Sequence, residues 1–202
     1  MSDKLIYVIV IHYSEIALKG KNRKYFERLF IDNIRKHING LQHSSIKLYE
    51  SRILINDINQ QDWKKYKKCL SNIMGLKNFI LMIKCKSNIE ELKNRATHLI
   101  KNEDFKNFRI TAKRNYKNLP FTSQDANILL GEFIQKKTSK PVNLDAPHLN
   151  IQIELLRDFS FIGTKKVYGF SGLPANSQEK ALSLISSGID SPVASFEMIK
   201  RG

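Results

Sequence analysis

The pattern of apolar and polar positions predicts a small mixed domain at residues 1–85. Apolar residues form a run of strand length near the N-terminus, recur at helical spacing after residue 22, and then return to short strand and helix patterns. The expected elements are a strand at 5–11, a helix at 22–38, strands at 46–49 and 52–56, a helix at 63–73 and a strand at 79–85. This β-α-β-β-α-β order is that of a ferredoxin-like unit.

A second unit is predicted at residues 86–170. Its expected elements are a helix at 89–100, a strand at 108–113, a helix capped by Thr122 or Ser123 and ending near 137, and a strand pair at 151–155 and 161–168 with a turn at 158–160. The stretch 171–180 contains Gly172, Pro174, Asn176 and Ser177, a composition typical of a linker. We therefore expect two packed units followed by a connection.

The last stretch, residues 181–202, has the pattern of a strand, a loop and a helix. Residues 181–185 are a short apolar run suited to a buried parallel strand, and an apolar helical stretch follows the loop at 186–191. A single strand and helix cannot bury a parallel sheet on both faces, so this piece is expected to be the truncated start of an α/β domain. The predicted fold class is α+β, with the truncated α/β strand-loop-helix at its end.

The charge favours a polyanionic partner. The chain has 34 Lys and Arg against 19 Asp and Glu, a formal net charge of +15, whereas residues 176–202 balance to zero. The excess therefore lies before residue 176 and favours nucleic acid, although a proteome rich in Lys would give the same sign. The two cysteines lack metal-site spacing, and neither a leader cleavage site nor an apolar run of membrane-spanning length is found, so we expect a cytoplasmic chain without a membrane partner.

Two basic segments are candidates for binding RNA phosphates. The first, KGKNRKYFER at 19–28, surrounds a helix start. Cationic side chains there are repelled by the positive end of the helix dipole, and an external anion would relieve that repulsion. The second flanks the strand at 108–113 and the loop RNYKNLPFTS, which mixes Arg, Tyr and Asn in the way that suits phosphates and unpaired bases. The candidate RNA-binding residues are Lys19, Lys21, Arg23, Lys24, Arg109, Lys113, Arg114 and Lys117. A solvated basic surface is the alternative for both segments, and the favoured interpretation of the lysines at 64–68.

The loop at 186–191, sequence SSGIDS, is a candidate phosphate-binding turn. A turn of small residues between a strand and a helix exposes backbone N–H groups at the positive end of the helix. Ser186 and Ser191 can donate hydroxyl hydrogen bonds, Gly188 permits close approach, and Asp190 can orient a ligand or contact a metal. From these residues alone, an ordinary strand-helix connection is the better-supported alternative.

Three ordered segments carry a resemblance to a known family. HYSEIALKGKNRKYFERLFIDNI at 12–34, FRITAKRNYKNLPFTSQDANILLGEFI at 108–134 and SLISSGIDSPVASFEMIKRG at 183–202 resemble the tRNA sulfurtransferases that make 4-thiouridine. The resemblance implies an N-terminal ferredoxin-like domain and a THUMP domain that hold the acceptor region of tRNA. It also implies a PP-loop domain that adenylates a uridine with ATP and magnesium, after which sulfur from a persulfide carrier replaces the activated oxygen.

The resemblance places ATP binding on Ser186, Ser187, Gly188, Asp190 and Ser191. The family pattern has glycine where Ser187 stands, and a Cβ there would oppose a positive φ or crowd the phosphate. The remaining PP-loop strands and the downstream catalytic cysteine region have no counterpart in these 202 residues, so no catalytic residue is assigned and ATP is not expected to bind well to this chain alone.

The leading hypothesis is a chain that holds tRNA as the N-terminal part of a tRNA 4-thiouridine synthetase, either a fragment or one half of a split enzyme. The alternative is a stand-alone THUMP module that serves a different tRNA-modifying partner. A separate C-terminal PP-loop chain and a second copy of this chain remain open as further partners.

Overall fold

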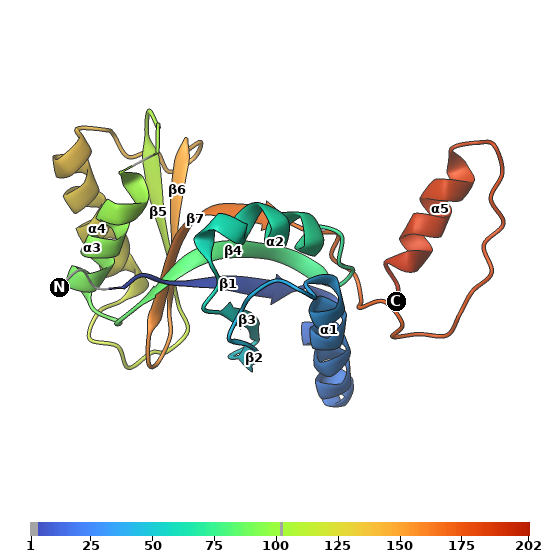
Figure 1. Ribbon diagram of the computed structural model, residues 1–202. Helices are drawn as coiled ribbons and strands as arrows, with labels where there is room; N and C mark the ends of the chain where they lie inside the picture. The colour runs from blue at the N-terminus through green and yellow to red at the C-terminus, as the bar shows by residue number, and fades with distance from the viewer. Residues whose placement is uncertain (1–3, 102) are drawn as a thin grey trace. The chain divides into compact units, whose positions relative to one another are not determined.

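The computed structural model describes residues 4–101 and 103–202, which divide into two compact units. We call the body formed by residues up to Val8 together with Leu81–Lys165 unit 1, and the body formed by Ile9–Ile80 with Lys166–Gly202 unit 2. Figure 1 labels the elements of both. The strands follow the hydrogen-bonded order β2-β3-β1-β4-β7-β6-β5, and β1, β4 and β7 contribute residues to both units.

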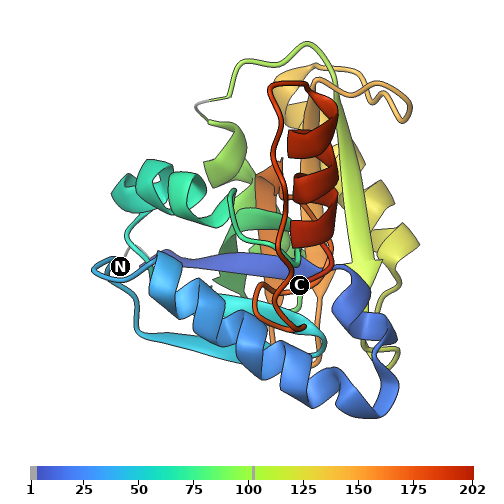
Figure 2. The ribbon, with the colours of Figure 1, turned by 90° about the vertical axis from the view of Figure 1, so that its right-hand side faces the viewer.

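Unit 2 contains the elements predicted for the first domain. They are β1 (Ile6–Tyr13), α1 (Arg23–His37), β2 (Ser45–Tyr49), β3 (Arg52–Asn56), α2 (Trp63–Leu70) and β4 (Leu76–Cys85). Two short 3-10 turns, Glu15–Leu18 and Gly20–Asn22, follow β1 and lead into α1, as the right of Figure 2 shows. The predicted β-α-β-β-α-β order is confirmed, and every predicted strand and helix of this part overlaps an observed one.

The β2–β3 hairpin has its turn at Glu50 and Ser51, whose φ values are 44° and 65°. Left-handed conformations at both central residues match the twist of a two-residue hairpin, although neither residue is the glycine that favours them. The strands pair with Tyr49 opposite Arg52, and β3 then pairs antiparallel with β1. The turn is thereby fixed beside the end of β1 and the start of α1.

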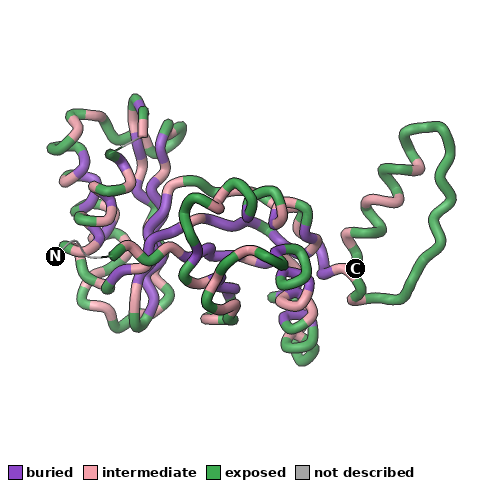
Figure 3. Tube along the Cα trace, in the orientation of Figure 1, coloured by how far each residue is buried: buried purple, intermediate pink, exposed green. Residues whose placement is uncertain are grey.

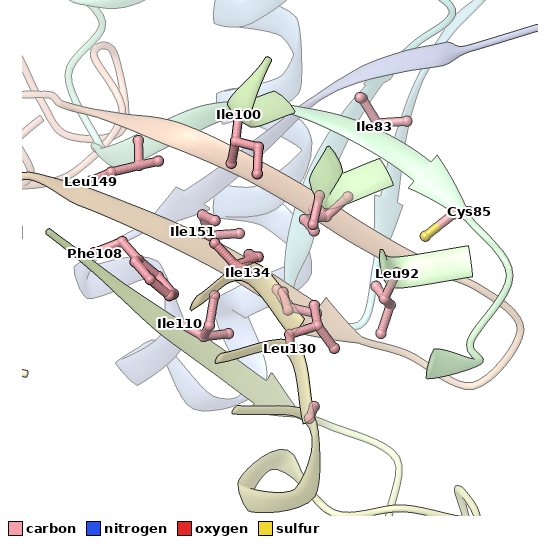
Figure 4. Close-up of a cluster of buried hydrophobic side chains, with 14 of the residues drawn as sticks. Ile83, Cys85, Leu92, Ile100, Phe108, Ile110, Leu130, Ile134, Leu149 and Ile151 are labelled. Carbon is pink, nitrogen blue, oxygen red and sulfur yellow. The ribbon is translucent and has the colours of Figure 1, made fainter. Parts of the chain in front are cut away.

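Unit 1 contains α3 (Ile89–Ile100), β5 (Phe108–Arg114), α4 (Ser123–Thr138), β6 (Leu149–Leu155) and β7 (Ser160–Tyr168). Both helices pack their apolar faces on one side of the strands, where Leu92, Leu130 and Ile134 meet Ile110 and Ile151 (Figure 4). Within the same cluster, burial raises the pKa of the Cys85 thiol to about 12, which keeps this cysteine protonated. Cys85 is therefore a core residue.

The two helices of unit 1 begin at side-chain caps. The Asn88 side chain accepts a hydrogen bond from the backbone N–H of Glu91, and Thr122 and Asp125 form a reciprocal capping box at the start of α4. Such caps satisfy N–H groups that have no partner within a helix, and each contributes about 1 kcal/mol. The choice between Thr122 and Ser123 is thus decided in favour of Thr122.

The final stretch differs from its prediction. Residues 181–185, all within the described chain, form no strand, and Leu182 and Leu184 are 92% and 84% exposed. Figure 3 shows the exposed tube through residues 178–190. A parallel strand requires hydrogen-bonded neighbours and covering helices, and no described segment supplies them here. Only the helix of the predicted unit forms, as α5 (Asp190–Ile199).

The stretch predicted as a linker is partly built into unit 2. Gly172, Leu173 and Pro174 are buried, and the Leu173 N–H donates to the carbonyl oxygen of Lys200 at 2.9 Å. Gly172 has φ +76°, and a Cβ at this position would lie 2.3 Å from the Lys200 carbonyl oxygen. Glycine is needed there because the backbone of the α5 end passes so close.

No helix among the described residues is both long enough and apolar enough to cross a membrane.

Candidate nucleic-acid interface

Arg23 stands at the first position of α1 and is held by three side chains of unit 2. Its Nε donates to Glu27 Oε1 at 2.7 Å, and its Nη2 donates to the Tyr13 and Ser51 hydroxyl oxygens, both at 2.6 Å. Tyr13 in turn donates to Glu27 Oε1 at 2.5 Å. The cluster therefore joins the end of β1, the first turn of α1 and the β2–β3 turn.

The electrostatics of this cluster favour a structural role for Arg23. The Glu27 side chain is 7% exposed, so its carboxylate needs the guanidinium as a partner. The hydrogen bond to Glu27 is the main cause that raises the pKa of Arg23, and burial is the main cause that raises the pKa of Tyr13. Because most of its donors are used internally, Arg23 orients the basic segment and is poorly placed to bind a phosphate itself.

The lysines around Arg23 differ from it in exposure. Lys21 and Lys24 are exposed, whereas Lys19 is half-buried with its Nζ 4.9 Å from the centre of the Phe26 ring. Tyr25, which neighbours Lys24, is 48% exposed. Lys21, Lys24 and the likewise exposed Arg28 are therefore the basic residues of this segment that can reach an external anion.

In unit 1, the pairing of the strands brings three strand ends together. β5 and β6 are parallel with Arg114 opposite Leu155, and β7 begins opposite them at Ser160. The end of β4 joins the same edge, because Ser87 Oγ lies 2.8 Å from Ser160 Oγ and 3.3 Å from the Leu156 carbonyl oxygen. We call this edge, where β4, β5 and β6 end, the carboxyl edge of unit 1.

The carboxyl edge is rich in basic side chains. They are Lys84, Lys86, Lys113, Arg114, Lys117 and Arg157. All of these except Lys84 and Arg114 are exposed. Helix α3 begins directly after this edge, and Arg114 Nη1 donates to the Phe121 carbonyl oxygen next to the cap of α4 at 3.4 Å. Two positive helix ends and the basic side chains thus give this edge a local preference for anions.

The acidic residues around the two helix starts are engaged within the protein. Asp125 Oδ2 accepts from the backbone N–H of Thr122 at 2.7 Å, and this hydrogen bond is the main cause that lowers the pKa of Asp125. Along α3, Glu90 pairs with Lys93, and Glu91 pairs with Arg95. Glu90 and Glu91 are therefore neutralised by basic residues of their own helix, whereas Asp125 keeps its charge and also interacts electrostatically with Arg114.

Of the predicted residues of the second segment, Lys113, Arg114 and Lys117 lie together and Arg109 lies apart. Arg109 is near the start of β5, four residues and roughly 13 Å from Lys113 along an extended strand. Its Nη1 donates to the Leu144 carbonyl oxygen at 2.6 Å. Arg109 thus holds the loop that precedes β6, at the other end of the strand.

Lys84, Lys86 and Arg157 were missed by the sequence interpretation. Each lies in or next to a predicted strand or turn, but nothing in the local sequence shows that these strand ends meet Lys113. The signal that identifies them is topological: parallel strands that precede helices present their carboxyl ends at one edge. Sequence alone did not establish which strands are parallel.

In the loop at 186–191, residues 186–190 are exposed and Ser191 is half-buried, and the hydroxyls of Ser186 and Ser191 lie within hydrogen-bonding distance of each other. Ser191 Oγ accepts from the Ser186 N–H at 2.8 Å and lies 2.9 Å from Ser186 Oγ. Positive φ values of described non-glycine residues occur at Glu50, Ser51, Asp57, Ser139, Ser171 and Asn176, so the positive φ that a Cβ would oppose is absent at Ser187. A Cβ at Gly188 would make only an ordinary contact, 3.7 Å from Ser186 Oγ.

The donors of this loop suit phosphate oxygens, since serine hydroxyls stand before the N-terminus of α5. Asp190 begins that helix and is exposed. Among the described residues, no group of three His, Cys, Asp or Glu side chains is placed to hold a metal ion.

Comparison with known families divides the chain in the same order as its motifs. Residues 8–79 match the family model of the ThiI ferredoxin-like domain, residues 86–165 match that of the THUMP domain, and residues 176–202 match that of the thiamine biosynthesis protein ThiI.

Curated relatives match across almost the whole chain. A probable tRNA sulfurtransferase of Methanocaldococcus jannaschii is 36% identical, covering 96% of this chain and 53% of the relative. A probable tRNA sulfurtransferase of a Geobacillus species is 32% identical, covering 96% of this chain and 49% of the relative. The chain therefore spans about half the length of the curated relatives it matches.

Solved structures agree with this assignment. A 4-thiouridine synthetase in complex with RNA and bound ATP matches with a TM-score of 0.78 and 32% identity, over 98% of this chain and 50% of that one. A protein from Pyrococcus horikoshii shares the fold with a TM-score of 0.82 at 23% identity, over 97% of this chain and 66% of that one. With three family models in order and relatives along its whole length, the chain belongs to the ThiI family of tRNA sulfurtransferases and corresponds to their ferredoxin-like domain, THUMP domain and the start of the ThiI domain.

Proposed function

We propose that this chain binds tRNA and holds it for the ATP-dependent thiolation of a uridine to 4-thiouridine. The observation that carries the proposal is the carboxyl edge of unit 1, where exposed Lys and Arg side chains gather beside two helix N-termini. A surface of this kind binds the phosphate backbone without reading the base sequence. The similar 4-thiouridine synthetase was solved with RNA, which supports the same partner here.

Within this proposal, the exposed lysines and the arginines have distinct tasks. Lys113 and Lys117 of unit 1, and Lys21 and Lys24 of unit 2, bind phosphates of the tRNA acceptor region. Arg23 orients its segment through Glu27, and Arg114 orients the loop before α4 through the Phe121 carbonyl. Arg109 contributes by holding its neighbouring loop.

The loop at 186–191 is proposed to hold the phosphates of ATP, with magnesium, in the complete enzyme. Ser186, Ser187 and Ser191 supply hydroxyl donors, the backbone at Gly188 permits close approach, and Asp190 orients the bound group. When bound, ATP would adenylate the uridine oxygen. That oxygen would then leave with AMP as sulfur from a persulfide takes its place. The exposed surroundings of this loop support the expectation that residues 1–202 alone bind ATP poorly.

Titration of fluorescent tRNA with the chain at several salt concentrations tests the binding function. We expect log affinity to fall linearly with log salt, with a slope of about 0.7 to 0.9 per phosphate neutralised. Binding that is independent of salt, or absent at low salt, would exclude the proposal. Mixing the chain with the C-terminal half of a relative, and measuring 4-thiouridine by mass spectrometry, tests its place in thiolation.

A further inference from the structure

The β6–β7 turn lies next to the loop that follows β5. The turn is closed by a hydrogen bond from the Leu156 N–H to the Phe159 carbonyl oxygen at 3.1 Å. The Asn115 N–H donates to the Leu155 carbonyl oxygen at 3.0 Å, which ties the loop carrying Tyr116 to the start of this turn. The turn therefore lies beside the loop that carries Tyr116 and Lys117.

Two cation-aromatic pairs bracket the turn. The Arg157 guanidinium carbon lies 5.7 Å from the centre of the Tyr116 ring, and Lys84 Nζ lies 4.1 Å from the centre of the Phe159 ring. Phe159 also packs edge-on against Phe161, with 5.1 Å between ring centres. The Lys84–Phe159 pair is thus anchored to the core, whereas Arg157 is exposed and Tyr116 half-buried.

We propose that the β6–β7 turn belongs to the RNA-binding surface, with Arg157 and Tyr116 forming a platform on which an unpaired base stacks. The proposal rests on the proposed RNA-binding function. A planar guanidinium held over an aromatic ring offers its outer face for stacking, and its charge also attracts the phosphates flanking the base. Lys113 and Lys117 bind the backbone next to this platform.

The chemistry selects unpaired over duplex RNA. Bases within an A-form helix are stacked on their neighbours and lie in grooves that side chains reach poorly, so only an unpaired base presents its face to such a platform. The charge around the turn would attract either form, since phosphates are common to both. A preference for single strands that depends on Arg157 and Tyr116 is therefore the distinguishing property.

Binding of the full chain to a short single-stranded RNA and to a blunt duplex of the same length, measured across salt, tests the proposal. Arg157→Ala is expected to weaken single-strand binding about tenfold and to lower the salt slope by about 0.7. Arg157→Lys restores the slope but not the full affinity, because it keeps the charge and loses the planar fork. Tyr116→Leu weakens single-strand binding about tenfold with an unchanged slope, and Tyr116→Phe binds like the parent.

The matched control is Arg35→Ala, which removes the same charge from an exposed arginine that pairs with Asp32 on α1. If Arg157→Ala binds like Arg35→Ala, or if the Arg157 variants weaken single strand and duplex equally, the platform does not exist. If the parent itself binds no RNA at low salt, the RNA-binding function has failed and not only the platform. Thermal melting of each variant checks folding, and the Arg157 variants carry the test by themselves if Tyr116→Leu unfolds.

Discussion

Two basic segments that look alike in sequence have different roles in the structure. At residues 19–24, the arginine is hydrogen-bonded to a buried carboxylate and two hydroxyls, and of the basic side chains Lys21 and Lys24 are exposed. At residues 113–117, the lysines project from a strand end where further basic residues arrive from β4 and the β6–β7 turn. A run of positive charge therefore mixes residues held by internal partners with residues left exposed, and a buried carboxylate partner marks the first kind.

The chemical reason for the difference is the carboxylate four residues after Arg23. An Arg and a Glu at this spacing lie on one face of a helix, and when that face is buried the pair must stay together. Neither Lys113 nor Lys117 has a carboxylate partner within its own segment, so the charge of each lysine remains available to solvent and to ligands. The comparison yields predictions that separate stability from RNA binding.

The largest effect is expected for Arg23→Ala. Removing the guanidinium leaves the buried Glu27 carboxylate without its main partner, which we expect to lower the free energy of unfolding by about 3 kcal/mol. Urea unfolding measures this loss, with the exposed Lys24→Ala as the control, which should stay within about 0.5 kcal/mol of the parent. A variant of normal stability but reduced salt slope would identify Arg23 as an RNA contact instead.

The double substitution Lys113→Ala with Lys117→Ala should act on the other property. We expect tRNA affinity at 0.1 M salt to fall by up to about 100-fold and the salt slope by about 1 to 2, because two phosphate contacts are lost. Stability should change little, since both side chains are exposed. The control pair is Lys64→Ala with Lys68→Ala on α2, which removes the same charge, and equal losses from both pairs would contradict a local binding site.

A smaller effect is expected at the cap that positions the loop after β5. Thr122→Ala should lower the free energy of unfolding by about 1 kcal/mol, because it removes the hydroxyl acceptor of the α4 capping box. Urea unfolding at pH 7 measures this loss.

The carboxylate of the same cap, Asp125, makes stability depend on pH. The pKa of Asp125 is lowered in the folded protein, so its contribution to the free energy of unfolding is present above its unfolded pKa and is lost as the pH falls through the lower folded value. Urea unfolding from pH 7 to pH 3 should therefore show a weaker acid dependence in Asp125→Asn, and identical profiles would exclude this cap as its source.

The smallest effect is expected for Ser187→Gly. Relief of a left-handed backbone would stabilise the chain by roughly 1 to 3 kcal/mol, but Ser187 has no positive φ and is exposed. We therefore expect the free energy of unfolding to change by less than about 0.5 kcal/mol. A clear stabilisation would show that the serine is strained. Calorimetry with ATP should detect no binding to residues 1–202, whether position 187 holds serine or glycine.

Local sequence predicted most of the elements of the fold. The strand and helix patterns are strong wherever one face is buried, as in α1 and in the hairpin of β2 and β3, and Thr122 with Asp125 marks the start of α4. The same reasoning failed at residues 181–185, because an apolar run becomes a parallel strand only when neighbours pair with it. It also proposed a linker where Leu173 is buried against the end of α5.

The candidate site was only partly contained in the sequence. Charge and motifs identified the basic segments, and Lys113, Arg114 and Lys117 are indeed neighbours. The tertiary structure decided that Arg109 lies at the opposite end of its strand, that Arg23 serves Glu27, and that Arg157 joins the lysines from a distant turn. The physical reason is that local patterns report which side chains a segment exposes, whereas strand direction and burial of a counter-charge depend on residues far away in the chain.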